Sequence, residues 1–180
     1  MNFASLSLAL IGTLLAQSSG SRTIDTMKSK ASFSVTHIWV ERVTGAVPIL
    51  NGSATFDDGS AIPARVIAVL DATRIATGEP DRDRSLESPD FFDSKKFPTW
   101  TFVSTKITPR GANSFEMDGN LTIHGVAQPE HVSVTVGGDA AHPVYHATAQ
   151  IDRHAFGMPV TRLDPTLGGT AYVALDVVFE

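Results

Sequence analysis

The feature that most constrains the fold of this chain is an alternation of apolar and polar residues that recurs along the sequence. In residues 114–123 (SFEMDGNLTI), Phe115, Met117, Leu121 and Ile123 alternate with polar side chains. The same period of two returns in residues 31–40, 131–136, 145–151 and 172–179. Successive side chains of a strand point to opposite faces, so this period is typical of antiparallel strands with one buried face.

Further strands are expected near residues 43–56, 64–72 and 99–108, separated by turn-forming sequences such as DDGS and PRGAN. About eight strands in 180 residues suit a single domain. Closing a sheet on itself removes its exposed edges, whereas an open sheet must protect them. We therefore predict an all-β fold built as a single eight-stranded antiparallel β-barrel, with a two-sheet sandwich as the alternative.

One long connection, residues 73–98, interrupts the pattern of strands. A connection of this length in a compact β domain usually has structure or a function of its own. Ser88 is expected to N-cap a helical turn that begins at Pro89, and Asp81 to cap an earlier turn. The sequence therefore predicts short helical segments within this connection.

Aromatic residues are unusually dense at the end of this connection, in residues 88–100 (SPDFFDSKKFPTW). Phe91 and Phe92 are adjacent, and on a helix they would point about 100° apart. Both are buried only if the turn lies deep against another layer of the protein. We therefore expect this segment to act as a plug or lid at the mouth of the barrel.

The N-terminal segment predicts export. Residues 1–21 contain no charged side chain, and residues 6–16 (LSLALIGTLLA) form an apolar run that is followed by small polar residues. This run has the length of a signal-peptide core and is too short to span a bilayer. We predict a signal peptide or targeting segment at residues 1–21 and a β-barrel domain at 22–180, in a periplasmic or secreted bacterial protein. The alternatives are an uncleaved anchor and a buried helix.

Composition and motifs exclude several classes of function. A net charge of −5 disfavours a nucleic-acid partner, which requires a basic surface. Without cysteine the chain has no disulfide, thiolate metal site or cysteine nucleophile, and it suits an oxidising compartment. The six histidines form no zinc-protease motif, and no hydrolase, phosphate-loop or dinucleotide motif is present. We predict no catalytic residue, no metal and no cofactor, and hence not an enzyme.

Two polar residues near apolar segments have more than one interpretation. His37 shares a strand face with Phe33, Val35 and Trp39, so it is either a hydrogen-bonded core histidine or a polar group aimed at a ligand in an apolar cavity. Arg153 follows a strand directly, next to Asp152. The pair is either a latch that closes the barrel or a contact at its rim for an anionic ligand.

Several of these segments together resemble the YceI-like family of lipid-binding proteins. The resemblance covers residues 25–180 and rests on segments in the right order rather than on any single motif. These are SFSVTH at 32–37 with Gly45 after it, RDRSLESPDFFDSKKFPTWTFVST at 82–105, GNLTIHGVAQP at 119–129 and IDRHAFG at 151–157. The chain departs from the family at Lys28-Ser29, where His-Ser is common, and at Ala155, where an acidic residue is usual.

The resemblance implies an extended, lipocalin-like barrel that holds a long apolar chain, such as a polyisoprenoid, an isoprenoid quinone or a fatty-acid derivative. A bound lipid of the polyprenyl or quinone type would then be the ligand, although no cofactor is expected. The predicted ligand-binding residues are Phe33, Val35, His37, Trp39, Phe91, Phe92, Phe97, Trp100, Phe102, Leu121, Ile123 and Phe156.

The predicted function is that of a carrier or scavenger whose partner is a hydrophobic small molecule. Transient contact with a membrane and a homodimer are both compatible with this function. Two alternatives remain at this point. The protein could be an enzyme acting on such a lipid, with His37 or Asp83 as acid or base, or a stress-protective barrel without a ligand.

Overall fold

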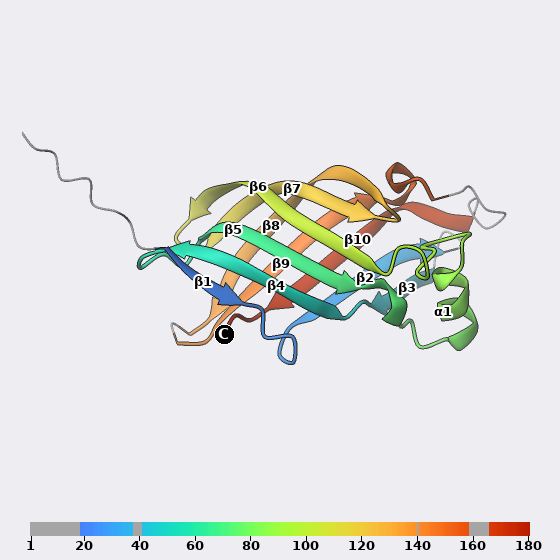
Figure 1. Cartoon of the computed structure of the whole chain (residues 1–180), viewed down its shortest axis with the longest axis horizontal. Helices are drawn as coiled ribbons and strands as arrows, with labels where there is room; N and C mark the ends of the chain where they lie inside the picture. The colour runs from blue at the N-terminus through green and yellow to red at the C-terminus, as the bar shows by residue number, and fades with distance from the viewer. Residues whose placement is uncertain (1–18, 38–40, 140, 159–165) are drawn as a thin grey trace, which may run out of the picture.

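The computed structural model describes residues 19–37, 41–139, 141–158 and 166–180. Most of these residues belong to one antiparallel sheet of ten strands, which curls around on itself (Figure 1). The buried side chains in its interior are mostly hydrophobic. The strands follow one another around the sheet in the order β1-β4-β5-β6-β7-β8-β9-β10-β2-β3. The predicted all-β barrel fold is confirmed.

The strands are joined mostly by short turns. Their bounds are β1 (Ser19–Thr23), β2 (Lys30–His37), β3 (Glu41–Ala46), β4 (Ile49–Asp57), β5 (Pro63–Asp71), β6 (Thr99–Gly111), β7 (Ser114–Ile123), β8 (Val126–Gly138), β9 (Pro143–Asp152) and β10 (Leu167–Val177). The helical elements are η1 (Ala72–Arg74), α1 (Pro80–Glu87) and η2 (Arg153–Phe156).

The strand count differs from the predicted eight for two reasons. The segment expected as one strand at 43–56 is two strands, β3 and β4, which meet at Val47 and Pro48. Proline lacks the N–H that a continuous ladder needs, and here the carbonyl of Pro48 accepts a hydrogen bond from Asp71 (2.8 Å) instead. The other extra strand is β1, which pairs with β4 and overlaps the predicted targeting segment at its C-terminal end. Residues 1–18 of that segment lie outside the described residues.

The segment after β1 joins the two sides of the sheet near the end of the chain. The backbone N–H of Ile24 donates to the carbonyl of Gly52 in β4 (3.0 Å), and that of Asp25 donates to Val178 beyond β10 (2.9 Å). Gly52 permits this approach, since a Cβ there would lie 2.4 Å from the side chain of Ile24. The barrel is therefore closed here by residues from near both ends of the described chain.

The alternation in the sequence is reproduced in the burial of the strands. In β7, Phe115, Met117, Leu121 and Ile123 are buried, whereas the outward Asp118 is exposed. Apolar burial of this kind stabilises the fold by about 25 cal/mol for each Å² removed from water. The same inward faces of the other strands line the interior that the next subsection describes.

The long connection carries one helix, α1, at one end of the barrel (Figure 1). Pro80 is its first residue, and Glu79 precedes it as the N-cap without a side-chain hydrogen bond. The predicted caps are wrong: Asp81 lies inside the first turn, and Ser88 ends the helix as its C-cap. The carbonyl of Ser85 accepts from both the backbone N–H (3.1 Å) and the hydroxyl (2.7 Å) of Ser88, because Pro89 has no N–H to continue the helical ladder. Residues 88–97 then run through turns rather than a second helix.

Candidate functional site

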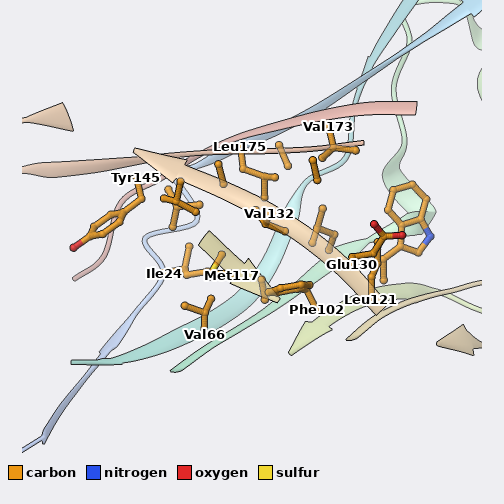
Figure 2. A pocket seen from close by; sticks show the side chains of 18 of the residues that line it. Ile24, Val66, Phe102, Met117, Leu121, Glu130, Val132, Tyr145, Val173 and Leu175 are labelled. Atoms are coloured by element: carbon orange, nitrogen blue, oxygen red, sulfur yellow. The ribbon is translucent and has the colours of Figure 1, made fainter. Parts of the chain in front are cut away.

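The interior of the barrel contains a cavity of about 140 Å³, which we call the lumen cavity (Figure 2). Its walls come from the inward faces of the strands and are almost entirely aliphatic and aromatic. Lining residues include Ile24, Val66, Leu70, Phe102, Met117, Leu121, Val132, Val134, Ala147, Ile151, Val173 and Leu175. On β7 these positions run from Phe115 to Ile123, which corresponds to roughly 27 Å along the strand.

One end of the lumen cavity is closed by packed aromatic rings. Tyr145 lies at this end in Figure 2, and its ring centroid is 5.1 Å from that of Phe179 and 6.2 Å from that of Phe56. The Tyr145 hydroxyl donates to the carbonyl of Ala61 (2.9 Å), and burial raises the pKa of this phenol. Because the Tyr145 hydroxyl is hydrogen-bonded to a backbone carbonyl, the ring can close the cavity without leaving a buried polar group unpaired.

A second cavity of about 380 Å³, the mouth cavity, lies at the other end beneath the long connection. The two cavities share wall residues, namely Phe33, Trp100, Ile123, Ile151 and Val173. The two cavities therefore adjoin, and the wall residues that they share are apolar.

The cover of the mouth cavity, which we call the lid, consists of α1 and the turns at residues 88–97. Leu86, Phe91 and Phe92 of the lid line the cavity, and the Phe92 ring packs against the indole of Trp100 with centroids 4.6 Å apart. The buried hydroxyl of Ser94 donates to the carbonyl of Ala72 (2.8 Å) and ties the lid to the body of the barrel. The prediction that aromatic residues of this connection lie at the mouth is confirmed for Phe91 and Phe92.

The mouth cavity has a polar side as well as an apolar one. Arg82 donates to the hydroxyl (2.8 Å) and the carbonyl (3.3 Å) of Thr77, and Arg153 donates to the carbonyl of Gly168 (3.1 Å). His37 also lines this cavity, with its Nδ1 3.6 Å from a carboxylate oxygen of Glu41. His37 is therefore a partly exposed cavity residue beside a carboxylate, and not a histidine enclosed in the core.

Glu130 is the one carboxylate among the described residues that line the lumen cavity. It lies at the end opposite Tyr145 (Figure 2), and within the described part of the chain no residue forms a hydrogen bond or an ion pair with its carboxyl group. Burial raises the pKa of its carboxyl group, and the negative charge of Asp152 raises it further. Our sequence reasoning missed this residue, although it lies two positions before Val132 on the same face of the strand.

The indole N–H of Trp100 is a second polar group without a partner. It is buried at the boundary of the two cavities, and no described residue accepts a hydrogen bond from it. Leaving a buried donor unpaired costs about 1–3 kcal/mol. An acceptor atom that reached this nitrogen would remove that cost.

The predicted ligand-binding residues fall into five groups. Phe102 and Leu121 line the lumen cavity, while Val35, His37, Phe91, Phe92 and Phe156 line the mouth cavity. Phe33, Trp100 and Ile123 line both. Phe97 lines neither: its ring packs on the turn between β7 and β8, 4.7 Å from the ring of His124 and against Gly125. Trp39 lies outside the described residues.

No group of three or more metal-ligating side chains occurs within the described ranges. None of the helices described there has both the length and the apolar composition to span a membrane.

Solved structures with similar folds come from several bacteria. BcnA of Burkholderia cenocepacia superposes with a TM-score of 0.74 at 25% identity, over 86% of this chain and 98% of that protein. A polyisoprenoid binding domain from Saccharophagus degradans gives 0.68 at 14% identity, over 88% and 97%. At 14% identity, the similarity to the Saccharophagus protein shows a shared fold alone.

The sequence itself matches a known family over most of its length. A UPF0312 protein of Vibrio parahaemolyticus is 28% identical over 165 residues, which are 87% of this chain and 84% of that protein. A UPF0312 protein of Pseudomonas fluorescens is 30% identical over 136 residues, 69% of each chain. Residues 23–179 match the YceI-like domain. The chain therefore belongs to the YceI-like family.

Proposed function

We propose that this protein binds a long apolar lipid of the isoprenoid type in its lumen cavity and carries it in the periplasm or outside the cell. The observation that supports this most directly is the pair of adjoining, mostly apolar cavities at the interior and the mouth of the barrel. The Saccharophagus protein of similar fold is described as a polyisoprenoid binding domain, which favours the same class of ligand.

The physical basis of binding is the removal of an apolar chain from water. Each buried CH₂ group contributes about 0.8 kcal/mol, and it needs no directional partner. A narrow lumen lined by side chains such as Met117, Val132 and Leu175 suits a slender, extended chain better than a bulky ring. Small-molecule sites usually combine such walls with a few polar groups, which here are Glu130 inside and the arginines at the mouth.

Native mass spectrometry of the purified protein tests this proposal. The expected result is a mass above that of the polypeptide, with an isoprenoid lipid recovered on extraction, or uptake of an added prenol or quinone by the stripped protein. A spectrum without bound lipid, together with no uptake of either probe, would contradict the proposal.

Two other functions make different predictions. An enzyme acting on the lipid would convert it during incubation, whereas a carrier returns it unchanged, so the recovered lipid separates these roles. A barrel without a ligand would need an interior filled by its own side chains, and cavities of about 140 and 380 Å³ argue against this.

A further inference from the structure

Glu130 is an unusual residue for the wall of a lipid-binding cavity. Its neighbours along β8 on the same face are Val132 and Val134, and all three line the lumen cavity. An unpaired carboxyl group in an apolar wall costs free energy that leucine at the same position would not. A hydrogen-bonding group on the ligand would offset that cost, so the residue is suited to recognise one.

We infer that Glu130 selects apolar chains that carry a hydroxyl group, and that this hydroxyl lies at the end of the lumen cavity where it meets the mouth cavity. The inference rests on the proposed function and adds the polar part of the ligand. Figure 2 shows Glu130 at this end, on the same side as Val173, which lines both cavities. The apolar chain then extends from Glu130 toward Tyr145.

The charges around the two cavities favour a neutral head group over an ionic one. Asp152 lies close enough to Glu130 to raise the pKa of its carboxyl group, so a carboxylate or phosphate at this point meets two negative charges. An ammonium group would have to pass the guanidinium groups of Arg82 and Arg153 in the mouth cavity. It would also form a buried ion pair, in which desolvation offsets much of the attraction.

A hydroxyl group suits Glu130 in either protonation state. It donates to an oxygen of the carboxylate, and it accepts from the O–H of the protonated acid. The carbonyl of a quinone only accepts, so it can bind Glu130 only when the acid is protonated. An isoprenoid alcohol is therefore the class of ligand that can bind Glu130 whether or not its carboxyl group is protonated.

Matched probes test this inference: farnesol, its methyl ether and farnesylamine share one isoprenoid chain and differ only in the head group. Their dissociation constants would be measured by titration calorimetry at neutral pH. The wild-type protein is expected to bind farnesol about tenfold more tightly than the ether, which corresponds to about 1.4 kcal/mol. Glu130→Leu is expected to bind both equally, because it leaves no acceptor for the hydroxyl.

The control is Glu116→Gln, which removes a carboxylate from the outer face of the neighbouring strand β7 and is expected to keep the wild-type preference. A melting curve for each variant verifies that it is folded, and Glu130→Gln replaces Glu130→Leu if the latter unfolds; its neutral amide is expected to shrink the preference. The inference is overturned if wild type binds alcohol and ether equally, if the preference survives in the Glu130 variant, or if farnesylamine binds most tightly. If no probe binds wild type at all, the proposed function itself fails.

Discussion

Replacing Gly119 with alanine would place a methyl group directly against the ring of Phe102. A Cβ at this position would lie 2.4 Å from Phe102 Cζ, 2.6 Å from its Cε2 and 2.7 Å from the carbonyl oxygen of Val103. The ring can rotate away, but the carbonyl belongs to the ladder of β6 and cannot. Overpacking of this kind typically costs about 1–3 kcal/mol.

The substitution is expected to affect the ligand as well as the fold. Phe102 lines the lumen cavity, so a ring displaced by the new methyl group moves into a space of only about 140 Å³. We expect Gly119→Ala to lower both the free energy of unfolding and the affinity for an isoprenoid chain. For a domain of this size, a loss of 1–3 kcal/mol lowers Tm by roughly 2–12 °C.

Urea denaturation and titration with farnesol measure the two effects separately. Gly20→Ala is a suitable control, because a Cβ at Gly20 meets no atom within 4 Å. Adding Phe102→Leu to Gly119→Ala should restore part of the affinity, since the smaller side chain makes room for the methyl group. The reasoning is refuted if Gly119→Ala is as stable as the Gly20 control and binds farnesol as wild type does.

Three further predictions concern the lid, the closed end and the lumen carboxylate. A variant with both Phe91 and Phe92 changed to serine should release a bound lipid faster than wild type. Native mass spectrometry would show this as a quicker loss of the complex on dilution. Unchanged release together with lower stability would mean that the two residues belong only to the core. Tyr145→Phe should lower the free energy of unfolding in urea by about 1 kcal/mol, because the hydrogen bond to Ala61 is lost, while farnesol binding stays the same. Burial raises the pKa of the Glu130 carboxyl group in the folded state, so the folded protein binds this proton more tightly than the unfolded chain does. The free energy of unfolding should therefore fall as the pH rises from the pKa of the unfolded state through that of the folded state. Glu130→Gln should flatten that fall in urea titrations across this pH range, and an identical fall in the variant would show that Glu130 is not its source.

The period of two allowed the fold to be predicted because it reports burial directly. Each inward residue of β7 and β9 occupies a position that alternation assigns to the interior. The same rule, extended back along β8 from Val132, would have placed Glu130 in the cavity, but a charged residue does not register as part of an apolar pattern. The position of Glu130 in the cavity was therefore predictable. Its carboxyl group's lack of a hydrogen-bond or ion-pair partner among the described residues was not, because that depends on how the other strands pack around it.

The errors in the prediction have local causes. Ser88-Pro89-Asp90 has the composition of a helix start, yet the same serine serves equally well to end α1, and the choice depends on Pro80 having started the helix earlier. Phe97 looked like another mouth residue, but Gly125 leaves a space on the β7–β8 turn that its ring fills. In both cases the outcome depends on a second segment, Pro80 for Ser88 and Gly125 for Phe97, so the residues around the predicted site could not reveal it.

The joint between Thr23 and Glu180 has a consequence for the order in which the barrel can form. These residues are 157 positions apart, and hydrogen bonds in both directions connect them (3.2 and 2.9 Å). Hairpins such as β6–β7 can form as soon as they leave the ribosome, because their partners are adjacent in sequence. The hydrogen bonds between Thr23 and Glu180 must wait until Glu180 has been synthesised, and contacts of such separation are slow to form. During synthesis the cavity for the lipid is therefore an open trough, and it becomes an enclosed compartment only after Glu180 has been added.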